Sequence, residues 1–76
     1  MKEKKQKQYL LLFNETFNFL SNNLYNLELI PELIQAYNNI VVLNRKLNKN
    51  KNYDKNKYLN NKKLFSKIIT KYKKRS

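Results

Sequence analysis

Residues 8–44 read QYLLLFNETFNFLSNNLYNLELIPELIQAYNNIVVLN and contain no Lys or Arg. Apolar residues recur in the first half of this stretch at spacings of three and four, which is the pattern of an amphipathic helix and not of a strand. The pattern predicts a helix over residues 4–28. Its apolar positions are Leu10, Phe13, Phe17, Leu20, Leu24 and Leu27.

Pro31 divides this stretch into two parts, because proline disfavours helix at the preceding residue and suits the first turn of a new helix. Glu32 follows it and complements the positive end of a helix dipole. We therefore expect a second helix over residues 31–47, and a helical hairpin over residues 1–47. The apolar face of the second helix would contain Leu33, Ile34, Tyr37, Ile40, Val41 and Leu47.

The charge changes sharply after this apolar stretch. Residues 45–76 carry 13 of the 17 basic residues and one acid, Asp54. Residues 48–61, NKNKNYDKNKYLNN, are of low complexity and are interpreted as a linker. Helical spacing returns in Leu64, Phe65, Ile68, Ile69 and Tyr72, which predicts a basic amphipathic helix over residues 62–76. The expected fold class is all-α: a helical hairpin followed by a basic low-complexity arm that ends in a short amphipathic helix.

The hairpin is small for a domain that folds alone. A packed unit of roughly 40 residues usually needs a disulfide, a metal or a partner. The chain has neither Cys nor His, so we expect a partner surface to complete the core. Gly is absent, while Asn and Lys dominate. That composition is typical of an AT-rich genome, although it does not account for the scarcity of Asp and Glu.

The basic arm predicts binding to a polyanion, and RNA is the preferred partner. Lys outnumbers Arg by 15 to 2, which favours contacts to the phosphate backbone over base-specific recognition. Tyr53 and Tyr58 are predicted to stack on bases or riboses. The basic residues predicted to bind RNA are Arg45, Lys46, Lys49, Lys51, Lys55, Lys57, Lys62, Lys63, Lys67, Lys71, Lys74 and Arg75.

Catalysis, cofactors and metals are not expected. Without His, Cys or Gly the chain offers no activated nucleophile, no usual zinc or haem ligand set and no Gly-rich phosphate loop. A membrane span needs about 18 consecutive apolar residues, and no segment approaches that length. The apolar run of residues 9–13 is too short for a signal peptide, and the N-terminus is not rich in Arg and Ser as a mitochondrial presequence would be. An organellar protein of this kind would therefore be made inside the organelle; otherwise we expect a cytoplasmic location.

The order of these features resembles the ribosomal protein twenty-nine family of the large subunit. In that family a long first helix ends in a Leu-Phe-Asn-Leu-Arg-Phe-like run, and a Pro-led second helix follows. Here residues 24–29 read LYNLEL, with Glu28 in place of the usual Arg, and Pro31 follows. In a second register, residues 62–70 take the place of the family's second helix. The resemblance implies a two-helix structural protein bound to ribosomal RNA near the exit tunnel.

The functional prediction is a non-catalytic RNA-binding subunit of a ribonucleoprotein. Its setting would be the ribosome of an AT-rich organellar genome, such as that of a mitochondrion, or of a reduced genome, with ribosomal RNA and neighbouring proteins as partners. One alternative is a small phage or mobile-element protein that binds and inhibits a host factor. Another is a peripheral subunit of an organellar membrane complex, with the basic arm facing lipid headgroups.

Overall fold

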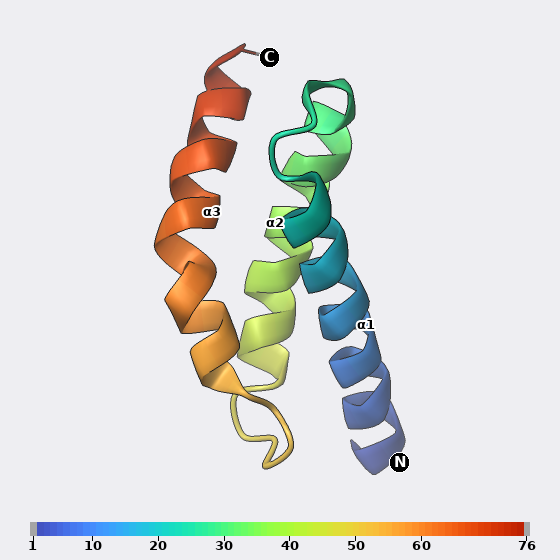
Figure 1. The fold of residues 1–76 in the computed structure, drawn as a ribbon. Helices are drawn as coiled ribbons and strands as arrows, with labels where there is room; N and C mark the ends of the chain where they lie inside the picture. Colours follow the sequence, from blue (N-terminus) through green and yellow to red (C-terminus); the bar gives the residue numbers. More distant parts are fainter. Residues whose placement is uncertain (1, 76) are drawn as a thin grey trace.

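The fold is an up-down-up bundle of three α-helices, seen in a computed structural model that describes residues 2–75 (Figure 1). In chain order the elements are α1 (Lys2–Asn23), the short 3-10 helix η1 (Leu27–Leu29), α2 (Ile30–Lys46) and α3 (Lys55–Arg75). The described part of the chain contains no strand, which confirms the all-α class. The bundle measures 41 × 20 × 18 Å.

Helix α1 ends five residues before the predicted boundary at residue 28. The Asn23 side chain turns back to donate to the Phe19 carbonyl oxygen at 2.9 Å. The Asn26 Oδ1 then accepts from the Glu28 backbone N–H at 3.2 Å and caps η1. Asn side chains compete in this way with the helical backbone bonds, so they end a helix that apolar spacing alone would continue.

Helix α2 agrees with its prediction to within one residue at each end. Pro31 lies in its first turn, where the missing N–H costs no hydrogen bond, and Glu32 follows it. Arg45 and Lys46 lie in the last turn, where they complement the negative end of the helix dipole.

Helix α3 begins at Lys55, so the prediction of a linker over residues 48–61 is wrong for its second half. The Asp54 Oδ1 accepts from the Asn56 backbone N–H at 3.0 Å and starts the helix. Tyr58 then begins a buried stripe that the sequence analysis placed only from Leu64 onward. Met1 and Ser76, the outer limits of the predicted hairpin and basic helix, lie outside the described residues.

All three helices contribute to one hydrophobic core. The basic segment is therefore not an arm beside a hairpin, since buried residues of α3 pack in the same core as those of α1 and α2. Aromatic rings meet across the helices, with the Phe17 and Phe65 ring centres 5.5 Å apart. The buried residues are Phe13, Phe17, Leu20, Leu24, Leu33, Ala36, Ile40, Leu43, Leu47, Tyr58, Phe65, Ile69 and Tyr72.

Candidate nucleic-acid interface

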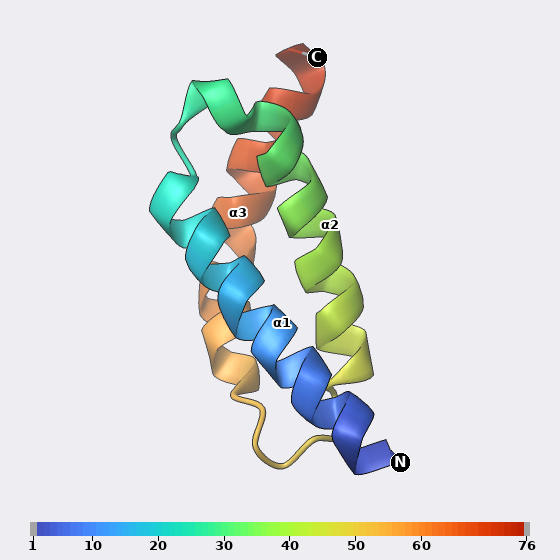
Figure 2. The same ribbon diagram turned by 90° about the vertical axis from the view of Figure 1, so that its right-hand side faces the viewer.

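The topology gathers lysines from distant parts of the chain at one end of the bundle. Figures 1 and 2 both place the start of α1 at the same end as the connection between α2 and α3. Lys5 and Lys7, near the start of α1, therefore lie close to the lysines that follow α2. These two groups are about forty residues apart in the sequence, and only the folded bundle unites them.

A hollow of about 770 Å³ lies between these segments, and we call it the lysine cleft. Five lysines line it, and no acidic residue does. Its floor is partly apolar, because Tyr9 and Leu10 are half-buried against the core. The residues that line the lysine cleft are Lys5, Gln6, Lys7, Tyr9 and Leu10 from α1, Lys46 from α2, and Lys49, Asn50, Lys51 and Asn52 from the connection.

Amide side chains hold the two walls of the lysine cleft together. The Gln6 Nε2 donates to the Lys46 carbonyl oxygen at 3.1 Å, and the Asn50 Nδ2 donates to the Gln6 Oε1 at 3.0 Å. The Asn50 Oδ1 also accepts from the Asn52 backbone N–H at 2.8 Å, which shapes the turn. Neutral amide groups make these links, and no carboxylate lines the cleft. The lysine ammonium groups therefore have no acidic partner among the lining residues.

The lysines and arginines predicted to bind RNA separate into two groups in space. Lys46, Lys49 and Lys51 come together in the lysine cleft, and all three are exposed. Lys55, next to the cleft in sequence, donates to the Asn48 Oδ1 at 3.0 Å. Arg45 is exposed near the end of α2, and Lys57, Lys62, Lys63, Lys67, Lys71, Lys74 and Arg75 are spread along α3.

Two cations of α3 lie against aromatic rings of the core. The Lys57 ammonium lies 4.7 Å from the centre of the Phe17 ring, and that of Lys62 lies 6.0 Å from the Tyr58 ring centre. Such cation–π contacts contribute to stability as well as to surface charge. Lys57 is half-buried by this contact, so its side chain contributes mainly to the packing of the bundle.

The structure does not support the stacking role predicted for Tyr58 and Tyr53. Only 4% of Tyr58 is exposed, because it begins the buried stripe of α3. Tyr53 is half-buried, with its ring edge-on to that of Phe13 at 5.0 Å and its hydroxyl donating to the Asn44 Oδ1 at 2.7 Å. Burial also raises the pKa of Tyr53 to about 12, with smaller contributions from Tyr58 and Asp54. Both rings serve the core in this fold.

Of the residues that line the lysine cleft, sequence reasoning found only Lys46, Lys49 and Lys51. Lys5, Lys7 and Tyr9 are among those that it missed. The N-terminal lysines were visible as a separate basic group, but their position beside Lys49 depends on the up-down-up topology. Tyr9 belongs to the apolar run of residues 9–13, and it does pack on the core. The Lys46 ammonium nevertheless lies 5.3 Å from its ring centre, so the ring belongs to the cleft as well.

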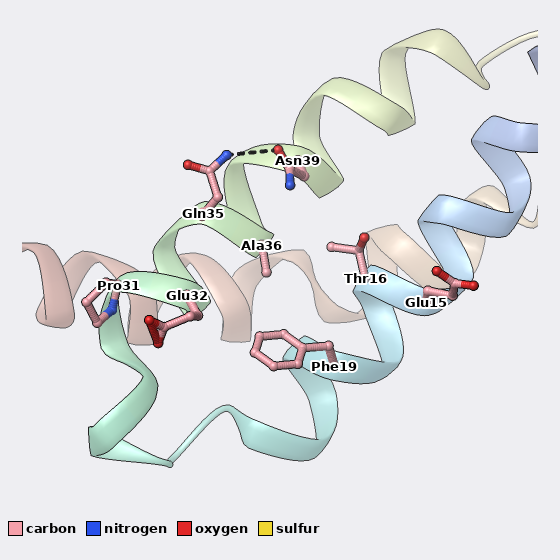
Figure 3. A pocket seen from close by; sticks show the side chains of 8 residues that line it. All are labelled: Glu15, Thr16, Phe19, Pro31, Glu32, Gln35, Ala36 and Asn39. Atoms are coloured by element: carbon pink, nitrogen blue, oxygen red, sulfur yellow. Dashed lines mark hydrogen bonds between the residues drawn. The ribbon is translucent and has the colours of Figure 1, made fainter.

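A second groove, of about 470 Å³, lies between α1 and α2 (Figure 3). The Phe19 ring lies between the two helices there, across from Ala36. Glu15 and Glu32 line this groove without any Lys or Arg, so its charge disfavours phosphate. Its other lining residues are Thr16, Pro31, Gln35 and Asn39. Charge therefore distinguishes this groove from the lysine cleft, which five lysines and no acidic residue line.

Comparison with known proteins gives no match to a family model, to a curated protein or to a solved structure. Within residues 2–75 there is no group of three His, Cys, Asp or Glu side chains placed to hold a metal ion. The same residues contain no helix with the length and apolar character needed to cross a bilayer.

Proposed function

We propose that this protein is a non-catalytic RNA-binding subunit of a ribonucleoprotein. The observation that carries the proposal is the gathering of five lysines, from two distant segments, around the lysine cleft. The exposed cations of α3 extend this surface along the bundle. A polyanion with regularly spaced charges can contact both at once and release its counterions, which makes its binding favourable and strongly dependent on salt.

The assembly that we propose is a ribosome of an AT-rich organellar or reduced genome, with ribosomal RNA and neighbouring proteins as partners. Support comes from the small size, the net charge of +12 and the resemblance of residues 24–31 to the ribosomal protein twenty-nine family. If the genome is mitochondrial, the protein acts inside the mitochondrion. A structural role is also supported by the lack of His, Cys and Gly, which removes most nucleophile, metal and phosphate-loop chemistry.

Sedimentation of the native protein from its source, with and without ribonuclease, tests this proposal. We expect the protein to migrate with a ribosomal subunit in a sucrose gradient and to leave that fraction after RNA digestion. Migration in a nuclease-resistant protein complex would contradict the proposal and favour the inhibitor of a host factor. Association with a detergent-solubilised membrane complex would contradict it in favour of the peripheral subunit.

A further inference from the structure

The lysine cleft differs in shape and lining from the basic surface of α3. The cations of α3 project from the outside of a helix, and such a convex surface can contact phosphates only from one side. The cleft is hollow, and its volume of about 770 Å³ lies within the range of pockets that hold small organic ligands. A surface that only neutralised phosphates would need no such hollow.

The floor of the lysine cleft offers contacts that a phosphate does not use. Tyr9 and Leu10 present partly buried apolar surface there. The aromatic ring of Tyr9 suits the flat face of a nucleobase, since every base can stack on an aromatic side chain. The Lys46 ammonium lies over this ring, 5.3 Å from its centre, so a stacked base requires the Lys46 side chain to move aside toward a flanking phosphate. Asn52 also lines the cleft, and its side-chain amide makes no hydrogen bond to another described residue, so it remains available to a base edge.

The form of RNA that fits this combination is an unpaired strand. In a duplex the bases are stacked and paired inside a cylinder, so a duplex can place phosphates on the rim of the cleft but no base on its floor. An unpaired nucleotide can turn its base outward onto an aromatic ring while its flanking phosphates stay at the surface. The exposed ammonium groups of Lys5, Lys7 and Lys49 surround the cleft at the places where those phosphates would lie.

We propose that the lysine cleft binds one unpaired nucleotide of RNA, with its base on Tyr9 and its flanking phosphates on the surrounding lysines. This inference rests on the proposed function and names the form of RNA that the site takes. The exposed cations of α3 lie on the outside of a helix, and this surface contacts backbone phosphates of paired and unpaired RNA alike.

The test measures the affinity of the full chain for two RNAs with equal numbers of nucleotides and nearly equal charge, a 12-nucleotide oligouridylate and a 6-base-pair RNA duplex, at one fixed salt concentration. We expect tighter binding of the oligouridylate. Tyr9→Leu keeps the apolar floor but removes the ring, so it weakens oligouridylate binding by roughly 5- to 150-fold, the range for loss of one base–aromatic stack. Its effect on the duplex is less than twofold, and Tyr9→Phe keeps the affinity for both RNAs.

Lysine variants provide an independent readout that does not alter the core. The double variant Lys5→Gln/Lys49→Gln removes two charges from the cleft, and Lys63→Gln/Lys67→Gln removes two from the exposed surface of α3. We expect the cleft variant to reduce the preference for oligouridylate over duplex. The α3 variant is the matched control, and it weakens binding of both RNAs by the same factor. If Tyr9→Leu unfolds the protein, the comparison of these two variants decides the question.

The outcomes separate this inference from the function on which it rests. Salt-dependent binding of both RNAs with equal affinity, unchanged in Tyr9→Leu, would overturn the nucleotide site while leaving RNA binding in place. Equal losses for oligouridylate and duplex in the cleft variant would overturn it as well. Failure of the native protein to bind either RNA, together with binding to vesicles of anionic lipid, would overturn the proposed function itself.

Discussion

Tyr72 joins the C-terminal parts of α1 and α3, at one end of the bundle, through a single buried hydrogen bond. Its hydroxyl, near the end of α3, donates to the backbone carbonyl oxygen of Leu24, just beyond the end of α1. Carbonyl groups in this position have no partner within their own helix. The tyrosine therefore supplies a bond that the chain cannot otherwise make at this buried site.

Tyr72→Phe removes that bond and leaves the carbonyl of Leu24 without its donor. We expect the free energy of unfolding to fall by about 1–3 kcal/mol, the usual cost of a buried unsatisfied group. Urea unfolding followed by circular dichroism measures the change. Tyr25→Phe is the matched control, because Tyr25 is 68% exposed and its substitution is expected to change stability by less than about 0.5 kcal/mol. Equal effects of the two substitutions would contradict this role.

Tyr53 makes stability dependent on alkaline pH. Its pKa is raised, chiefly by burial, from 10.0 to about 12 in the folded protein. The folded state thus favours the neutral phenol, whose contribution to stability is complete below the unfolded pKa and is lost as the pH rises through the folded pKa. We expect native stability to fall toward that of Tyr53→Phe between about pH 10 and pH 12. Urea unfolding of both proteins measures this gap, and a constant gap over this range would refute the expectation.

At the scale of elements, apolar spacing predicted where helices lie better than where they begin and end. The spacing from Leu10 to Leu24 predicted a helix where α1 lies, and Pro31 predicted the start of α2 to within one residue. The end of α1 and the start of α3 depend on Asn26 and Asp54, whose side chains bond the backbone two residues ahead. In a chain so rich in Asn, composition does not distinguish such a cap from an Asn on a helix surface.

The substitution Phe65→Ala tests whether α3 is an integral part of the fold. Phe65 is 2% exposed and packs edge-on against Phe17. We expect a loss of about 3–5 kcal/mol in the free energy of unfolding, as for other buried aromatic residues. Leu64→Ala, at a neighbouring position that is 43% exposed, should cost much less. A negligible effect of Phe65→Ala would restore the original prediction that the basic segment is an independent arm.

The candidate site was predictable only in part, because it is a property of the whole molecule. The charge imbalance and the preference for backbone contacts follow from composition alone. Lys49 and Lys51 were therefore among the predicted residues, whereas Lys5 and Tyr9 required knowledge of which chain segments meet at one end. Tyr58 was misassigned for a similar reason: it lies in a segment rich in Asn and Lys, but in space it packs in the core.

The net charge of +12 also predicts how the whole molecule responds to salt. Mutual repulsion of lysines along α3 and around the cleft opposes the compact state, and added salt screens it. Raising NaCl from about 20 to about 200 mM should increase the melting temperature by roughly 4–8 °C, which corresponds to about 1 kcal/mol in a chain of this size.

Differential scanning calorimetry measures this shift directly. The variant Lys63→Gln/Lys67→Gln, which loses two exposed charges, should melt higher than the native protein at low salt and respond less to added NaCl. A melting temperature that falls with salt would mean that attraction between opposite charges outweighs repulsion in the folded protein.

Each connection in the bundle changes direction without glycine. Asn26, Asn50 and Asp54 all accept a bond from the backbone N–H two residues ahead, and no residue in the described part of the chain has a positive φ angle. The bends thus depend on side chains that AT-rich codons supply freely. A gene under such mutational bias loses glycine codons and gains asparagine codons. This fold tolerates that change because its turns already use Asn and Asp side chains instead of glycine.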